Sequence, residues 1–200
     1  MTHLVLALTA AAPDPDTAAA LLAPRLFAGC EKKRDPRALR EGLAVRLLLQ
    51  CALASLCPDL SPRLAISEGG RPFLCDCPLF VSLSHSRDRL AVALSETPCG
   101  VDVEDEAAVR DPKALARRFL PPEEAAAIAA SSDPALCFLQ AFTLREAALK
   151  RGDGDTLCRV MAQPPPPGFS RVLCLPDGRR SVLSAVGEGP FAITECTLPG

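Results

Sequence analysis

The order of predicted strands and helices constrains the fold most, because one plan occurs twice, before and after about residue 98. In each half a strand is followed by a long helix and then by further strands, although no internal sequence repeat accompanies the plan. The expected fold is therefore α+β, with two similar halves that each pack a small antiparallel sheet on a long helix. We expect these halves to be residues 1–98 and 99–200.

Hydrophobic periodicity and turn residues locate the individual elements. The longest periodic helix is predicted at 37–56, and a second long helix, with Asp133 as its N-cap, at 134–151. The sequence Gly69-Gly70-Arg71-Pro72 is typical of a turn. The other predicted elements are strands at 3–9, 78–85, 90–94, 101–104, 172–175, 182–186 and 191–196, and short helices beginning at Asp14 and spanning 112–120 and 122–130.

Composition narrows the classes of function. A net charge of −2 lacks the basic excess of nucleic-acid-binding proteins, and no apolar run is long enough to span a membrane. The apolar stretch 4–12 has no Lys or Arg before it, so it fits a first strand better than a signal sequence. The ten cysteines include no C-x-x-C pair. We expect a cytoplasmic monomer with reduced cysteines that binds neither nucleic acid nor membranes.

Four charged residues could share one pocket. Asp102 and Glu104 are two positions apart on a predicted strand, so their side chains point to the same face, and Glu146 and Lys150 share one side of a predicted helix. Three carboxylates and one ammonium can hold a divalent cation against a phosphate, and Mg²⁺ prefers such oxygen ligands. Each pair has another interpretation: the solvated face of an edge strand, or a helical Glu–Lys pair worth about 0.3 kcal/mol.

Two adjacent polar residues end another predicted strand. Ser84 and His85 point to opposite faces of that strand, which argues against a Ser–His nucleophile, and no G-x-S-x-G elbow is present. Both side chains remain possible hydrogen-bond donors to a phosphate.

Basic side chains offer further contacts to an anion. The turn that contains Arg71 could direct its guanidinium at a phosphate. The segment with Lys32, Lys33, Arg34 and Arg37 is either a solvated loop or part of the same anion site. No P-loop sequence is present, which argues against the common nucleotide-binding fold of that type.

Taken in order, these motifs resemble the 4′-phosphopantetheinyl transferase superfamily, in its larger, pseudo-dimeric, Sfp-like type. The resemblance covers residues 66–154 and extends to 37–49. It rests on the order and spacing of short motifs, at 70–72, 81–86, 100–104, 118–119, Glu123 and 142–150.

The resemblance implies the 4′-phosphopantetheinyl transferase fold and a reaction. The phosphopantetheine arm of coenzyme A is moved to a serine of an acyl carrier protein or peptidyl carrier domain, and adenosine 3′,5′-bisphosphate is released. Asp102, Glu104 and Glu146 would hold Mg²⁺, or Mn²⁺ in its place. Glu104 or Glu146 would be the base for the carrier serine. Lys150 would contact coenzyme A and stabilise or protonate the departing phosphate.

The resemblance also implies how coenzyme A is bound. Ser84, His85 and Arg71 match positions that contact it, with His85 at its 3′-phosphate and Arg37 or a neighbouring base assisting there.

The chain departs from the family pattern beside Glu146. Phe142 and Arg145 replace a usual Trp and Lys; Phe lacks the indole N–H, and Arg is not a proton donor in the way that Lys can be. These changes favour, as one alternative, a catalytically weakened subunit that binds coenzyme A or a carrier. Another alternative is a different Mg²⁺-dependent phosphotransferase. Arg118 could steer an acidic carrier, together with Arg117, or could pair with Glu123 or Glu124.

Overall fold

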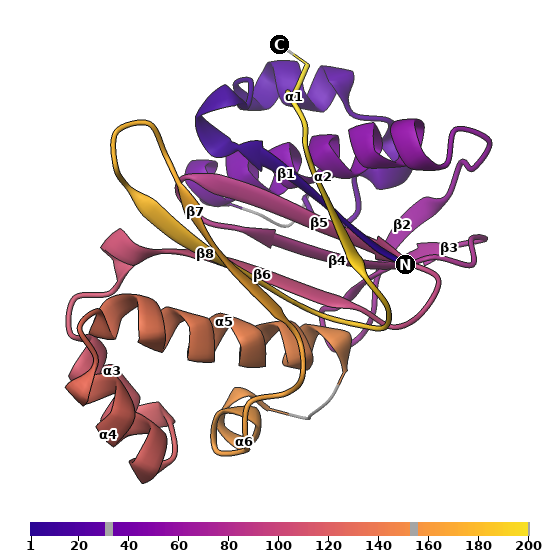
Figure 1. Ribbon diagram of the computed structural model, residues 1–200. Helices are drawn as coiled ribbons and strands as arrows, with labels where there is room; N and C mark the ends of the chain where they lie inside the picture. Colours follow the sequence, from indigo (N-terminus) through magenta and orange to yellow (C-terminus); the bar gives the residue numbers. More distant parts are fainter. Residues whose placement is uncertain (31–33, 153–155, 200) are drawn as a thin grey trace.

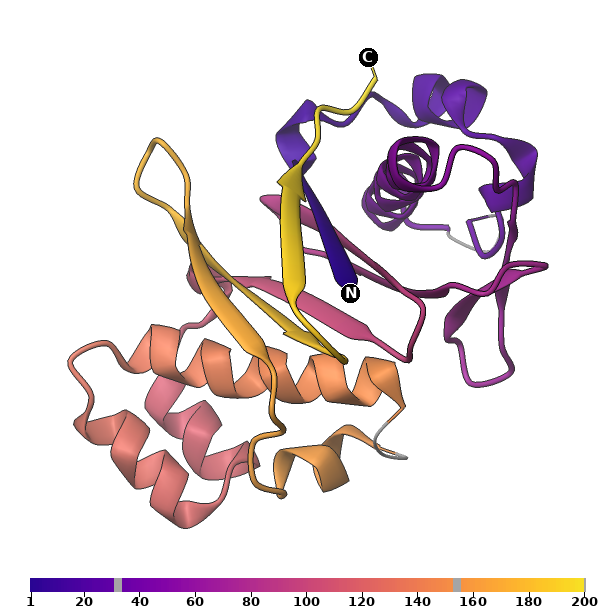
Figure 2. The same ribbon diagram turned by 45° about the vertical axis from the view of Figure 1, so that its right-hand side comes forward.

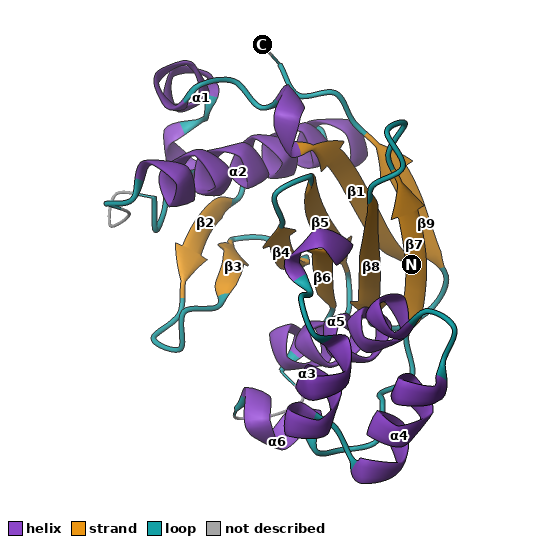
Figure 3. Ribbon diagram, turned by 90° about the vertical axis from the view of Figure 1, so that its left-hand side faces the viewer, coloured by secondary structure: helices purple, strands orange, loops and turns teal. Residues whose placement is uncertain are grey.

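The computed structural model describes residues 1–30, 34–152 and 156–199, so the basic residues Lys32 and Lys33 lie outside the described residues. The predicted α+β fold is confirmed: one long helix, α2 (Pro36–Leu56), packs against a first sheet, and another, α5 (Pro134–Arg151), packs against a second (Figure 1). Figure 3 shows the strands between these two helices. None of the described helices is long and apolar enough to cross a membrane.

The first sheet has four strands in the order β4-β5-β1-β9. They are Phe80–His85 (β4), Arg89–Ser95 (β5), Thr2–Leu8 (β1) and Phe191–Glu195 (β9). Side chains alternate between two environments along β5: Leu90 and Val92 join the core formed with α2, whereas Ala91 and Ala93 join the core formed with the second sheet. The small alanines allow the two sheets to approach closely. Helix α1 (Pro15–Leu21), capped by the Asp14 side chain, covers α2 (Figure 2).

The second sheet is antiparallel, in the order β6-β8-β7. Its strands are Gly100–Asp105 (β6), Arg180–Val186 (β8) and Phe169–Cys174 (β7). Helix α5 lies along β6 and β8, and three shorter helices pack around α5: Pro112–Phe119 (α3), Pro122–Ala130 (α4) and Leu157–Met161 (α6). Gly100 is required where β6 meets α5, since a Cβ atom there would lie 1.8 Å from the carbonyl oxygen of Ala147.

Serine side chains connect the two sheets where β4 meets β6. The Oγ atom of Ser82 accepts a hydrogen bond from the backbone N–H of Val101 (3.1 Å), and that of Ser84 accepts one from Val103 (3.2 Å). These residues alternate on β4, so both serines face β6. The connection brings Ser84 beside the acidic residues of β6.

Three elements differ from the prediction. β9 leaves the C-terminal half and pairs in parallel with β1, so the first sheet is not purely antiparallel. The hairpin of β2 (Arg63–Ile66) and β3 (Pro72–Cys75), and helix α6, were not predicted, because four or five residues are too few to show a period. The turn at Gly69–Gly70 does join β2 to β3. Among the described residues, 3₁₀ turns occur at Thr9–Ala11, Pro24–Leu26 and Glu106–Ala108.

Candidate active site

Asp102 lies at the centre of a polar cluster between β4, β6 and α5. It is 4% exposed, and its Oδ1 atom accepts hydrogen bonds from Lys150 Nζ (2.6 Å) and Ser84 Oγ (2.8 Å). Lys150 Nζ also lies 3.0 Å from Ser84 Oγ. The other carboxylate oxygen, Oδ2, is buried and has no hydrogen-bond partner among the described residues. The structure thus brings together three residues that the sequence placed in one site.

Glu104 and Glu146 are half-buried beside Asp102. The pKa of the Glu104 carboxyl is raised to about 7, first by burial and then by the negative charge of Asp102, while Lys150 acts in the opposite direction. The pKa of Glu146 is also raised, first by burial and then by Asp102. The cluster therefore has more negative charge than Lys150 alone can balance.

The chemistry of these side chains fits a divalent cation. Three carboxylates supply oxygen donors, and the Oδ2 atom of Asp102 lacks a hydrogen-bond partner among the described residues. The two neighbouring carboxyls have raised pKa values, first because they are buried and then because the charge of Asp102 is close. Yet no three His, Cys, Asp or Glu side chains in the described parts of the chain are grouped closely enough to enclose an ion. In this structure Lys150 balances the charge of Asp102 instead.

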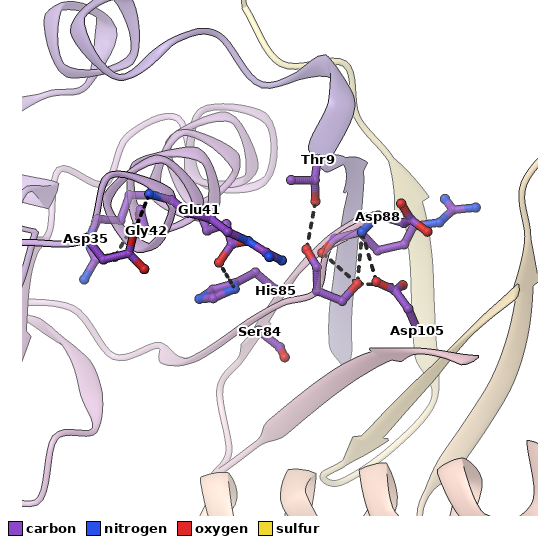
Figure 4. A network of polar contacts seen from close by, with 12 residues as sticks. Thr9, Asp35, Glu41, Gly42, Ser84, His85, Asp88 and Asp105 are labelled. Carbon is purple, nitrogen blue, oxygen red and sulfur yellow. Dashed lines mark hydrogen bonds and ion pairs between the residues drawn. The ribbon is translucent and has the colours of Figure 1, made fainter. Parts of the chain in front are cut away.

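His85 points away from Ser84, toward α2, as expected for neighbours on a strand (Figure 4). Its Nδ1 atom lies 3.5 Å from Glu41 Oε2, and the other oxygen of Glu41 accepts a hydrogen bond from Arg37 Nε at 2.9 Å. These residues line a cavity of about 340 Å³, and Glu104 lines it too. The structure thus places Arg37 and His85 together, near one of the predicted metal ligands.

A larger cavity of about 1210 Å³ is lined by Lys150 of the cluster. Lys150, Arg151 and Arg71 contribute positive charge to its wall, and Phe73 and Phe80 contribute apolar surface. The guanidinium of Arg71 lies 3.4 Å from the carbonyl oxygens of Leu149 and Arg151, at the C-terminus of α5. Arg71 is therefore near Lys150, although it comes from the β2–β3 hairpin.

Sequence reasoning missed three residues of these cavities. Glu41 stands one helical turn after Arg37, and this spacing was a usable signal for an ion pair on α2. Phe73 had no comparable signal, because β3 was not predicted. Phe80 lies on the predicted strand at 78–85, but the strand pattern does not show which cavity its side chain lines.

The two departures from the family pattern lie outside the site. The Arg145 side chain is fully buried and forms two hydrogen bonds with the carboxylate of Glu124, at 3.0 and 2.6 Å. It also donates to the carbonyl oxygens of Ala141 and Gln163. It therefore connects α5 with α4 and with the segment after α6, away from Asp102.

Phe142 and Arg118, two further residues named from the sequence, each contact an aromatic ring. The ring of Phe142 packs against that of Phe138, with centroids 5.7 Å apart. The guanidinium of Arg118 lies 5.1 Å from the ring centroid of Phe119, while Glu124 is bound to Arg145. The suggested pairing of Arg118 with Glu124 is therefore not observed.

Comparison with protein families agrees with the resemblance seen in the sequence. Residues 98–185 match the model of the 4′-phosphopantetheinyl transferase superfamily. The matched segment includes the acids of β6 and the whole of α5, and hence Asp102, Glu104, Glu146 and Lys150. The search of curated proteins found no match. The match thus agrees with the resemblance over these residues and supports phosphopantetheine transfer in general, while the Sfp-like type stays a prediction.

Proposed function

We propose that this protein transfers the 4′-phosphopantetheine arm of coenzyme A to a serine of an acyl carrier protein or peptidyl carrier domain, and that it requires Mg²⁺. The observation that carries the proposal is that two neighbours of Asp102 line two cavities, Glu104 the smaller and Lys150 the larger. The smaller cavity has Arg37 and His85 in its wall, and the larger one has Lys150 and apolar side chains. Coenzyme A, with its phosphates and a long arm that carries methyl and amide groups, has matching chemistry.

In the proposed reaction, the hydroxyl oxygen of the carrier serine bonds to the phosphorus that bears the pantetheine arm. The bond from that phosphorus to the bridging oxygen of the pyrophosphate breaks, and adenosine 3′,5′-bisphosphate leaves with that oxygen. The serine proton passes to Glu104 or Glu146, directly or through water.

The remaining residues hold and stabilise the reactants. Asp102, Glu104 and Glu146 would hold Mg²⁺, which when bound neutralises charge on the pyrophosphate. The ammonium of Lys150 is placed to stabilise the departing phosphate. Ser84 keeps Lys150 and Asp102 in place through its hydroxyl.

The binding roles of the other cations follow from their places around the cavities. Arg37 and His85 would bind the 3′-phosphate in the smaller cavity. Arg71 would contribute positive charge beside the larger one.

The environment and state of the protein belong to the same proposal. We propose a cytoplasmic monomer, consistent with the thiol form of all ten cysteines, none of which is in a disulfide.

The deciding experiment uses the protein with an apo-carrier, coenzyme A and Mg²⁺, and the carrier is then weighed by mass spectrometry. We expect a mass increase of one phosphopantetheinyl group, and none after chelation of the metal. Asp102→Ala should abolish the increase, whereas Glu188→Gln, an exposed acid outside the site, should not. No increase with any of several acyl and peptidyl carriers would refute the proposal. Binding of coenzyme A without transfer would favour a weakened binding subunit instead.

A further inference from the structure

We infer that Glu41 is a positioning residue, which holds Arg37 and His85 together so that both contact one phosphate monoester. The inference rests on the proposed function, in which that monoester is the 3′-phosphate of coenzyme A. Glu41 itself would not touch the ligand.

The three residues come from two elements and meet through the Glu41 carboxylate, whose contact with His85 is seen in Figure 4. Arg37 and Glu41 lie one turn apart on α2, whose first turn is fixed by the Asp35 side chain, which accepts a hydrogen bond from the backbone N–H of Arg37. His85 is the last residue of β4. Glu41 Oε1 binds Arg37 Nε at 2.9 Å, and Oε2 lies 3.5 Å from His85 Nδ1. The contact therefore joins a helix to a strand that belong to separate parts of the sequence.

Arg37 and Glu41, which both lie on α2, differ in how far their side chains are exposed, and this difference indicates different roles. The Glu41 side chain is 15% exposed, whereas that of Arg37 is 63% exposed. The carboxylate is thus on the inner side of the cluster, and the guanidinium extends toward solvent, where a ligand can reach it. An exposed helical ion pair needs no third partner, so the His85 contact calls for an explanation beyond helix stability.

The hydrogen-bond chemistry supports positioning. A carboxylate next to Nδ1 fixes the orientation of an imidazole ring and directs its other nitrogen, Nε2, to the opposite side. A bond to Nε of an arginine likewise sets the plane of the guanidinium fork, which suits phosphate oxygens. Both groups line the same cavity of about 340 Å³. One phosphate could then meet Arg37 and His85 together.

The opposite role would be competition, because the negative charge of Glu41 could repel an anion. The two roles predict opposite results when the carboxylate is removed. A positioning Glu41 makes the protein prefer coenzyme A over 3′-dephospho-coenzyme A, and its loss weakens that preference. A competing Glu41 reduces the preference, and its loss strengthens it.

The test measures the Kd of both compounds by calorimetry with Mg²⁺, for the wild type, Glu41→Ala, Glu41→Gln and the control Glu188→Ala. We expect Glu41→Ala to lower the preference for coenzyme A by about tenfold, with the affinity for 3′-dephospho-coenzyme A unchanged. Glu41→Gln keeps the size and an acceptor oxygen, so it should show a smaller loss in the same direction. In turnover with a carrier, KM for coenzyme A should rise while kcat stays near the wild-type value. The control should match the wild type.

Other outcomes overturn the inference in distinguishable ways. An unchanged or stronger preference in both Glu41 variants, or an equal loss of affinity for both compounds, would refute positioning while leaving the proposed function intact. Equal affinity of the wild type for both compounds would likewise refute positioning and leave the proposed function intact. A wild type that binds neither would refute both proposals. If Glu41→Ala does not fold, Glu41→Gln decides alone, and an undiminished preference in it refutes the inference.

Discussion

Asp102 has unequal surroundings at its two oxygens. Oδ1 receives hydrogen bonds from Lys150 and Ser84, whereas Oδ2 is buried without a partner among the described residues. A buried charge is tolerated when a counter-charge is close and becomes costly when that partner is removed. Lys150 therefore has a structural role in the metal-free protein, besides the catalytic role proposed for it.

Lys150→Met should destabilise the metal-free protein, because the Asp102 carboxylate then lacks its cation. We expect the free energy of unfolding to fall by about 1–3 kcal/mol, measured by urea denaturation. The double variant Asp102→Asn/Lys150→Met should recover part of the loss, since no buried charge is then left unpaired. Lys113→Met, at an exposed lysine of α3, serves as the control. Equal stability of Lys150→Met and the control would contradict the pairing.

Glu104→Gln should stabilise the metal-free protein at alkaline pH and leave it unchanged in acid. The pKa of Glu104 is raised in the folded state from 4.5 to about 7, so the wild type loses stability as the pH rises through this window. A glutamine has no proton to lose. Urea denaturation at about pH 5 and about pH 8 should show a stabilisation by the variant that grows with pH. The same difference at both pH values would show that charge is not the cause.

Spacing indicated which charged residues share a face, and the family resemblance gave them their predicted roles in one site. Positions two apart on β6 and four apart on α5 suffice to place Asp102 and Glu104 on one face, and Glu146 and Lys150 on another. The contact between Glu41 and His85 could not be predicted in this way. It depends on how α2 packs against the end of β4, and local periodicity carries no information on the distance between two elements.

Helix α5 presents different chemistry on its two sides. Glu146 and Lys150 face the candidate active site, while Arg145 is buried against α4 and the segment after α6. The structure therefore explains why Arg145 can stand where the family that the sequence resembles usually has Lys. A guanidinium can form two parallel bonds with Glu124 and still donate to nearby carbonyl oxygens, which an ammonium cannot match in geometry.

Arg145→Ala should destabilise the protein strongly without altering its chemistry. Removal of the guanidinium leaves the Glu124 carboxylate unpaired in a partly buried place, and we expect a loss of about 3–5 kcal/mol in the free energy of unfolding. Arg145→Lys should lose less. The transfer rate per folded molecule, measured by mass spectrometry, should stay near the wild-type value for Arg145→Lys. A large fall in that rate would mean that Arg145 influences the reaction.

Clear patterns made the longer elements predictable. The long helices α2 and α5 contain several turns, so their apolar period is clear, and β5 and β8 are marked by apolar runs between turn residues. β2, β3 and α6 were not predicted; they have four or five residues, although β9, also of five residues, was predicted. Their absence from the prediction also hid Phe73, and with it much of the wall of the larger cavity.

At the scale of the whole molecule, the two halves are not independent. β9 follows the second sheet in the sequence and yet pairs in parallel with β1 of the first, and Leu198 beyond it is buried in the first core. The alternation of apolar residues predicted β9 as a strand but could not reveal its partner, because a strand pattern does not encode pairing. The division at residue 98 stays a prediction, and β9 is the segment that crosses it.

Removal of residues 191–200 should destabilise the protein and promote self-association. The truncation exposes the edge of β1 and removes apolar side chains such as Leu198 and Ile193, which we expect to cost at least about 3 kcal/mol in the free energy of unfolding. Thermal unfolding and size-exclusion chromatography would measure both effects. Glu195→Gln, which removes only an exposed partner of Arg89, is the control. A stable, monomeric truncation would show that β9 is dispensable.

The pairing of β1 with β9 has a consequence for synthesis on the ribosome. Among the described strands, β1 is made first and β9, one of its two neighbours in the sheet, is made last. That edge of β1 therefore stays open until β9 has been made. A nascent chain of this protein should thus depend on chaperones for longer than one whose strands pair in the order in which they emerge.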